Sequence, residues 1–114
     1  MYKILNQENE TVAYIQNMMI LNKKREKVIG LVIGDCFFGN DTKVIGKIID
    51  QKVYLLNGEI IGTIEANKDK KDPELKKGLM LEAWEILSNI KSHTSDWITI
   101  SKKWSKKSLI EVLQ

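Results

Sequence analysis

The sequence predicts a mostly β fold (α+β class), in which four consecutive short β-hairpins form a pseudo-fourfold repeat and a C-terminal helical extension follows. Two observations predict the repeat: an apolar-x-Gly-x-apolar segment and an Asn-containing turn each recur every 16 to 18 residues in the first half of the chain. A third is the polar linker that then precedes a segment with helical periodicity. We therefore expect a single domain, with a four-hairpin unit at residues 1–66 and a C-terminal part at residues 67–114 packed on it.

Composition and charge are those of an ordinary globular protein. Of the 114 residues, 43% are hydrophobic and 29% are charged, and no apolar run approaches the ~20 residues that cross a bilayer. The first residues turn polar too early for a signal-peptide core, and the single Cys36 cannot form an internal disulfide, so we expect a cytoplasmic location. The net charge of +3 lies in residues 66–114, because Lys/Arg and Asp/Glu balance in residues 1–65.

The clearest hairpin lies at residues 53–65, where two apolar runs flank Asn57-Gly58. Because Asn and Gly tolerate positive φ, this dipeptide predicts a two-residue type I′ turn between strands at Val53–Leu56 and Glu59–Glu65. The equivalent turns of the other copies are marked by Asn40, Asn22 and Asn6. One hairpin alone is marginal in water, so the four copies are expected to pool their apolar faces.

Aligning the four copies gives columns of residues with shared character. In the second strands the columns are Ile60/Val44/Val28/Thr11, Gly62/Gly46/Gly30/Ala13 and Ile64/Ile48/Val32/Ile15. In the first strands, counted back from the turn Asn, they are Val53/Cys36/Met18/Tyr2 and Leu55/Phe38/Ile20/Ile4. Because alternate strand residues share a face, the second-strand columns predict an apolar core face. A glycine inside a strand indicates that another backbone comes close, so Gly30, Gly46 and Gly62 predict a crowded centre.

Short turns are also expected between the copies. Their positions are Gln16-Asn17, Gly34-Asp35, Asp50-Gln51 and Ala66-Asn67. Together with the turns inside the copies, they predict eight short strands in continuous up-and-down order.

The repeated strand and turn of residues 2–66 resemble those of the small bacterial 4-fold β-flower domains. The first copy departs from the pattern, with Ala13 in place of Gly and Lys3 where Tyr54 and Phe37 stand in other copies. The resemblance implies four hairpins arranged like petals about a pseudo-fourfold axis, in a bacterial protein. It implies no catalytic residues, because no activity is established for that family.

Beyond Ala66, the polar linker 67–71 leads to Asp72-Pro73, which predicts a helix start with Asp as N-cap and Pro in the first helical position. We place a helix at Pro73–Lys91, because apolar residues recur there at helical spacing: Leu75, Leu79, Met80, Ala83, Trp84, Ile86, Leu87 and Ile90. Trp97–Ile100 alternates like a strand, with a helix as the alternative. Ser108–Glu111 has the spacing of a capping box and predicts a last helical turn.

Few residues are suited to catalysis or metal binding. Cys36 shares its column with apolar residues, which favours a buried structural thiol over a nucleophile. His93 is the only histidine and lies in a polar loop, where a solvent-exposed role is expected. One His and one Cys do not supply the three or four ligands of a zinc site. We therefore expect no enzyme activity, no catalytic, cofactor-binding or metal-binding residues, and no cofactor.

The basic segment Ser101–Ser108 is the best candidate for a binding surface. Its lysines could contact phosphates while its tryptophan stacks on a base, which marks Lys102, Lys103, Trp104, Lys106 and Lys107 as nucleic-acid contacts. The turn at residues 22–27 could add Lys23, Lys24, Arg25 and Lys27 to this surface. Two simpler interpretations stay open: the lysines form a solvated surface, and the tryptophan anchors the C-terminal segment.

Function is predicted only as a class: a non-enzymatic interaction or structural module, with a protein partner that the sequence does not identify and no membrane. The alternative is a weak, sequence-independent nucleic-acid-binding accessory protein. A homodimer is also expected, because a second apolar set lies on the opposite strand face and one helix is too short to cover it. That set is Ile61, Ile45, Ile29, Val12, Tyr54, Phe37, Met19, Leu31 and Tyr14.

Overall fold

The structure, a computed structural model, describes residues 1–39, 43–66, 77–90 and 98–113. Within these ranges, eight antiparallel strands form one closed barrel, in which each strand pairs with its sequence neighbours and β1 pairs with β8. The strands are β1 (Tyr2–Leu5), β2 (Thr11–Gln16), β3 (Met19–Leu21), β4 (Val28–Ile33), β5 (Cys36–Phe38), β6 (Val44–Ile49), β7 (Lys52–Leu55) and β8 (Ile60–Ala66). Two helices follow, α1 (Lys77–Ser88) and α2 (Leu109–Leu113). The expected fold class, mostly β with a helical C-terminal part, is confirmed.

Each hairpin pairs a small residue of its second strand with a larger apolar residue of its first strand. The pairs are Ile4 with Ala13, Ile20 with Gly30, Phe37 with Gly46, and Val53 with Gly62. The glycines are needed because the first strand of the next hairpin comes close. A Cβ on Gly46 would overlap the carbonyl oxygen of Tyr54, and one on Gly30 would overlap that of Phe38.

The first-strand columns expected from the sequence are wrong. Opposite the small residues, Val53 is equivalent to Phe37, Ile20 and Ile4, and not to Cys36, Met18 and Tyr2. The turns inside the copies differ in length, so counting back from the turn Asn shifts the alignment.

The expected type I′ turn at Asn57-Gly58 is also wrong. Of these two residues only Gly58 has a positive φ, of 90°. Its N–H donates to the carbonyl of Leu55 (2.9 Å), and the side-chain Oδ1 of Asn57 accepts from the N–H of Glu59 (2.9 Å). Asn57 therefore serves this turn as a side-chain acceptor and not through its tolerance of positive φ.

Paired positive φ angles, which type I′ turns require, occur instead between the copies. They are found at Asn17 and Met18 (49° and 68°) and at Asp50 and Gln51 (51° and 65°). The turn expected at Gln16-Asn17 lies one residue later, because Gln16 is the last residue of β2.

A bulge in each hairpin decides which apolar residues reach the centre. The register shifts after Ile4, Ile20, Phe37 and Val53, and the extra residue breaks the alternation of faces. Two sets that were expected on opposite faces therefore pack into one central cluster: Val12/Ile29/Ile45/Ile61 and Ile15/Val32/Ile48/Ile64.

Because of the same bulges, three further residues lie in other places than the sequence predicts. Phe37, expected on the outer face, lies in the central cluster. Val28 and Ile60, expected in the core, pack instead in two separate outer clusters.

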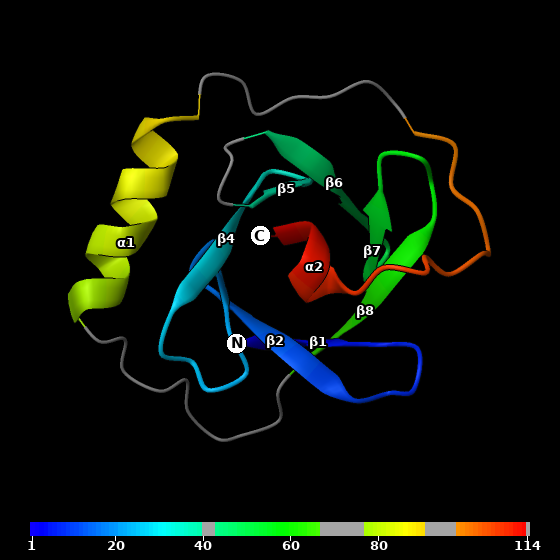
Figure 1. The fold of residues 1–114 in the computed structure, drawn as a ribbon, viewed down its shortest axis with the longest axis horizontal. Helices are drawn as coiled ribbons and strands as arrows, with labels where there is room; N and C mark the ends of the chain where they lie inside the picture. The colour runs from blue at the N-terminus through cyan, green and yellow to red at the C-terminus, as the bar shows by residue number, and fades with distance from the viewer. Residues whose placement is uncertain (40–42, 67–76, 91–97, 114) are drawn as a thin grey trace.

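The short helix α2 lies at the centre of the ring of hairpins (Figure 1) and completes the central cluster. Its Leu109 and Leu113 are buried. The expected capping box is confirmed: the Oγ of Ser108 accepts from the N–H of Glu111 (3.2 Å), and a carboxylate oxygen of Glu111 accepts from the N–H of Ser108 (3.3 Å).

α1 lies outside the barrel, against the β3–β4 hairpin (Figure 1). Leu79 is buried there, and the outer cluster that it joins also contains Met19, Leu21, Val28, Leu31, Tyr14, Ala83, Ile86, Leu87 and Ile90. A carboxylate oxygen of Glu82 accepts a hydrogen bond from the N–H of Val28 (3.1 Å), which satisfies a backbone donor at the bulge. The helix expected at Pro73–Lys91 is confirmed from Lys77 to Ser88. Its expected end is wrong, because Asn89 and Ile90 are described and lie after the helix, whereas its expected start lies outside the described residues.

The segment that leads to α2 runs along the β7–β8 hairpin. Ile60 donates its N–H to the carbonyl of Lys103 (2.8 Å) and accepts from the N–H of Ser105 (2.7 Å), which makes a parallel bridge with Trp104. The described part of the strand expected at Trp97–Ile100, residues 98–100, is not a strand. The backbone pairing lies at Trp104 instead, and Trp97 lies outside the described residues.

Candidate functional site

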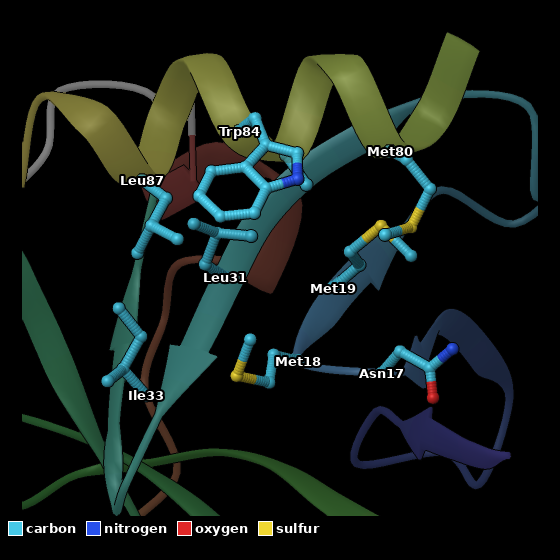
Figure 2. A pocket seen from close by; sticks show the side chains of 9 residues that line it. Asn17, Met18, Met19, Leu31, Ile33, Met80, Trp84 and Leu87 are labelled. Atoms are coloured by element: carbon cyan, nitrogen blue, oxygen red, sulfur yellow. The ribbon is translucent and has the colours of Figure 1, made fainter. Parts of the chain in front are cut away.

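An apolar pocket opens between α1 and the β3–β4 hairpin. It has a volume of about 120 Å³, and we call it the methionine pocket, lined by Asn17, Met18, Met19, Leu31, Ile33, Met80, Ala83, Trp84 and Leu87. Figure 2 shows Met80, Trp84 and Leu87 descending from α1 towards Met18, Met19, Leu31 and Ile33 of the hairpin side. Three of the chain's four methionines meet here. Methionine adapts to irregular apolar groups and is common at binding surfaces.

Local structure places each wall of this pocket. Leu79 and Ala83 pack α1 on the hairpin. Met80 and Trp84 are four residues apart and therefore project from one side of the helix. Opposite them, the positive φ of Met18 (68°) belongs to the turn that joins β2 to β3, and the carbonyl of Met18 accepts a hydrogen bond from Val32 (2.7 Å), which fixes this turn.

The rim of the pocket is apolar and exposed. Of the lining residues, Met18 is 57% exposed, Trp84 is 62% exposed and Met80 is 44% exposed. Asn17 is the one polar residue of the lining. A neutral surface of this kind suits an apolar partner and offers no group for acid-base chemistry.

One feature of the sequence does point to this pocket, although it also fits a buried helix face. Met80 and Trp84 widen the apolar stripe of the helix beyond what one buried face needs. Nothing in the sequence placed Met18 opposite them, because the turn and its register come only with the closed barrel.

A second cleft lies between β7 and the C-terminal segment. It has a volume of about 500 Å³, and we call it the lysine cleft, lined by Lys52, Tyr54, Ile60, Ile100, Ser101, Lys102 and Trp104. It joins two residues of the sequence-based candidate surface, Lys102 and Trp104, with Lys52 and Tyr54 from a distant part of the chain.

The five candidate nucleic-acid contacts do not form one continuous site. Lys103 is exposed and lines neither the lysine cleft nor the neighbouring opening that contains Lys106 and Lys107. Lys106 and Lys107 line another opening, of about 500 Å³, together with the carboxylates of Glu8 and Glu111. Trp104 is half-buried, packed against the outer cluster of Tyr54, Ile60 and Ile98, and lines both openings. Its role as an anchor, one of the two simpler interpretations, fits this packing.

Cys36 is buried, as expected for a structural thiol. Its Sγ donates to a carboxylate oxygen of Asp35 (3.5 Å), and the same carboxylate lies 3.6 Å from the ammonium of Lys47, whose side chain is itself buried. A cation therefore lies near the thiol, which the sequence columns did not indicate. The thiol is nevertheless only 1% exposed, so a reagent in solution has almost no access to it.

Neither a metal-ligand cluster nor a membrane-spanning helix is found among the described residues. No group of three or more His, Cys, Asp or Glu side chains there could hold a metal ion. Likewise, none of the described helices combines the length and apolarity of a membrane span. His93, expected to be exposed in a loop, lies outside the described residues.

No protein-family model, curated protein or solved structure matches this chain.

Proposed function

We propose that this protein is a non-enzymatic interaction module whose methionine pocket binds an apolar side chain of a second copy of the chain. One observation carries the proposal: Met18, Met80 and Trp84 are largely exposed although they border a preformed apolar pocket. Exposed apolar surface of this kind usually marks an interface.

The size and chemistry of the pocket suit one side chain. A closed apolar cavity of about 150 Å³ holds a benzene molecule, and the methionine pocket measures about 120 Å³. The pocket is somewhat smaller than that cavity, so a branched alkyl group suits it better than a ring. Leu81 is the most exposed large apolar residue of the described chain and follows Met80 on α1, where successive residues project about 100° apart.

A second copy is favoured as the partner because α1 carries both an exposed apolar side chain, Leu81, and residues that border the methionine pocket. A two-fold interface uses the same surface of both subunits, so Leu81 of each copy can enter the pocket of the other. Burying a large aromatic side chain removes ~150–250 Å² from water. Trp84 and its apolar neighbours thus supply a large share of the ~800 Å² per partner of a standard interface. Among the residues that the structure describes, no charged side chain lines the pocket, so like charges do not oppose the contact there.

This proposal narrows the dimer expected from the sequence. Four residues that motivated it, Val12, Ile29, Ile45 and Ile61, pack in the central cluster. The apolar surface proposed for self-association is therefore the exposed group of Met18, Met80, Leu81 and Trp84, called the α1 patch, and not the open face of a sheet.

Membership of the 4-fold β-flower family is part of the same proposal. Four sequential hairpins with matching bulges and the repeated Gly30, Gly46 and Gly62 support it. A bacterial, cytoplasmic setting is proposed with it, supported by the family resemblance and by the single buried Cys36.

Size-exclusion chromatography with light scattering tests the self-association. We expect a dimer for the parent protein at tens of micromolar, and a monomer for Leu81→Glu and Trp84→Glu. Leu56→Glu is the matched control, because Leu56 is an apolar residue 47% exposed in the β7–β8 turn, away from α1, and this variant should stay dimeric. A monomeric parent would exclude the second copy as the occupant, and a dimer that survives both α1 variants would exclude this patch.

A second candidate function is weak, sequence-independent nucleic-acid binding. One observation favours it: Lys102 and Trp104 line a cleft that, within the described part of the chain, no carboxylate lines.

A further inference from the structure

We infer that the lysine cleft binds a nucleotide unit, meaning a phosphate group carried next to an aromatic base. The unit is either a free mononucleotide or one nucleotide of a single-stranded nucleic acid. The inference rests on the second candidate function, to which it gives a defined site, and it does not depend on the methionine pocket.

Charge identifies the phosphate. Lys52 from β7 and Lys102 from the C-terminal segment both line the cleft, and both are exposed to solvent. No Asp or Glu of the described residues lines it, whereas the neighbouring opening sets Glu8 and Glu111 against Lys106 and Lys107. Two ammonium groups without a local counter-charge favour an anion, and the neighbouring opening offers no such excess.

Rings and size identify the base. Trp104 is half-buried and lines the cleft together with the buried Tyr54 and Ile60, and Ile100 adds an apolar wall that is 49% exposed. Trp104 is therefore the ring available for stacking. Bases stack on aromatic side chains without sequence preference. The volume of about 500 Å³ falls in the ~300–1,000 Å³ range of small-molecule sites.

The wall that carries Lys102 is fixed before any ligand arrives. Ser101 donates its N–H to the carbonyl of Gly58 (3.0 Å), and the Oγ of Ser101 accepts from the N–H of Lys103 (2.9 Å). A side chain at residue 58 would overlap the carbonyl of Thr99, so Gly58 is what lets this wall approach the hairpin. A preformed site loses little conformational entropy on binding, which offsets the small number of its charges.

Fluorescence anisotropy of a fluorescein-labelled decamer of deoxythymidine tests the cleft. Lys52→Ala/Lys102→Ala should weaken binding at least tenfold. Lys23→Ala/Lys24→Ala removes the same charge from the β3–β4 turn. The sequence offered this turn as an addition to the surface, but it lines neither opening beside the C-terminal segment, so this variant should change the affinity less than twofold. If two phosphates are contacted, the affinity of the parent should fall roughly sevenfold between 50 and 200 mM salt.

The variants separate failure of the cleft from failure of the function. Equal losses in the two double variants would overturn the cleft and leave only general charge attraction. A loss confined to Lys106→Ala/Lys107→Ala would move the site to the neighbouring opening, overturning the cleft while nucleic-acid binding stands. No binding by the parent at low salt would overturn both.

Competition experiments then show whether the bound unit is a free mononucleotide or part of a nucleic acid, and fluorescence tests the role of the Trp104 ring. Adenosine monophosphate that displaces the decamer indicates a mononucleotide site, and displacement only by an unlabelled decamer indicates single-stranded nucleic acid. In a Trp84→Phe/Trp97→Phe protein, Trp104 is the only tryptophan, and its emission should change when either ligand binds. An unchanged emission, or inorganic phosphate competing as well as the nucleotide, would overturn the stacking part of the inference.

Discussion

The two helices of this protein use apolar residues in opposite ways. α2 has only five residues, yet it lies at the centre of the barrel with Leu109 and Leu113 buried. α1 has twelve residues and buries one face on the β3–β4 hairpin, while Met80, Leu81 and Trp84 stay exposed. Figure 1 shows the contrast directly, with α2 inside the ring of hairpins and α1 outside it.

This difference separates what stabilises the fold from what remains available for binding. A helix of five residues does not persist alone in water, so α2 exists because its side chains complete the central cluster. Met80, Leu81 and Trp84, the exposed apolar residues of α1, are not part of that cluster, so the fold does not require them to be apolar. Residues of this kind are the ones for which a role in recognition is the better explanation.

The largest expected effect comes from shortening one leucine on each helix. Leu113→Ala removes a side chain that is 1% exposed from the central cluster, and should lower the free energy of unfolding by about 2–5 kcal/mol. Leu81→Ala removes one that is 68% exposed and should change the folding of the monomer by less than about 0.5 kcal/mol. Urea unfolding below the concentration of self-association measures both. Similar losses in the two variants would mean that α1 is as much a part of the core as α2.

Much of the barrel could be predicted from the sequence, because the second strands have a constant pattern. Gly30, Gly46 and Gly62 occur at the same place in three copies, Ala13 takes that place in the first, and with the recurring turn Asn they indicate the number and order of the strands. The turns inside the copies vary in length, so the first strands could not be aligned by counting from Asn57. The bulges left no signature in hydrophobicity, and without them the apolar columns were assigned to the wrong faces.

The candidate sites were less predictable, because each joins residues far apart in sequence. Trp104 and Lys102 stood out in a basic segment, but only the closed barrel brings Lys52 beside them. The methionine pocket depends on a turn at Met18 meeting α1 across β4. Neither contact follows from local periodicity, which informs on single elements and not on how they pack.

A smaller effect is expected from giving a Cβ to one glycine in the barrel and one on α1. A Cβ on Gly46 would overlap the backbone of Tyr54, whereas Gly78 has open space around it. Gly46→Ala should therefore lower the free energy of unfolding by about 1–3 kcal/mol, as overpacking does. Gly78→Ala should leave it unchanged or raise it by up to about 1 kcal/mol, because alanine favours a helix. Thermal unfolding distinguishes them, and a Gly46→Ala protein as stable as the parent would refute the crowded centre.

The smallest expected effect tests whether strain at the methionine pocket serves binding. Met18 has a φ of 68°, and Gln51 has a φ of 65° at the equivalent turn position. A residue with a bulky side chain in this left-handed region loses about 1 kcal/mol relative to one that tolerates it. Asparagine tolerates it well, so Met18→Asn and Gln51→Asn should each raise the free energy of unfolding by about 0.5–1 kcal/mol.

The two asparagine variants should differ in self-association although their stabilities match. Met18→Asn removes one wall of the pocket between α1 and the hairpin, so it should shift the light-scattering mass towards the monomer, whereas Gln51→Asn should not. That outcome would indicate that Met18 keeps a strained conformation because the pocket needs its side chain, which is how strained residues behave at binding sites. If Met18→Asn stabilises the fold and leaves the dimer intact, the strain at this turn is unrelated to the pocket. Met80, Leu81 and Trp84 of α1 must then bind the partner without the Met18 side chain.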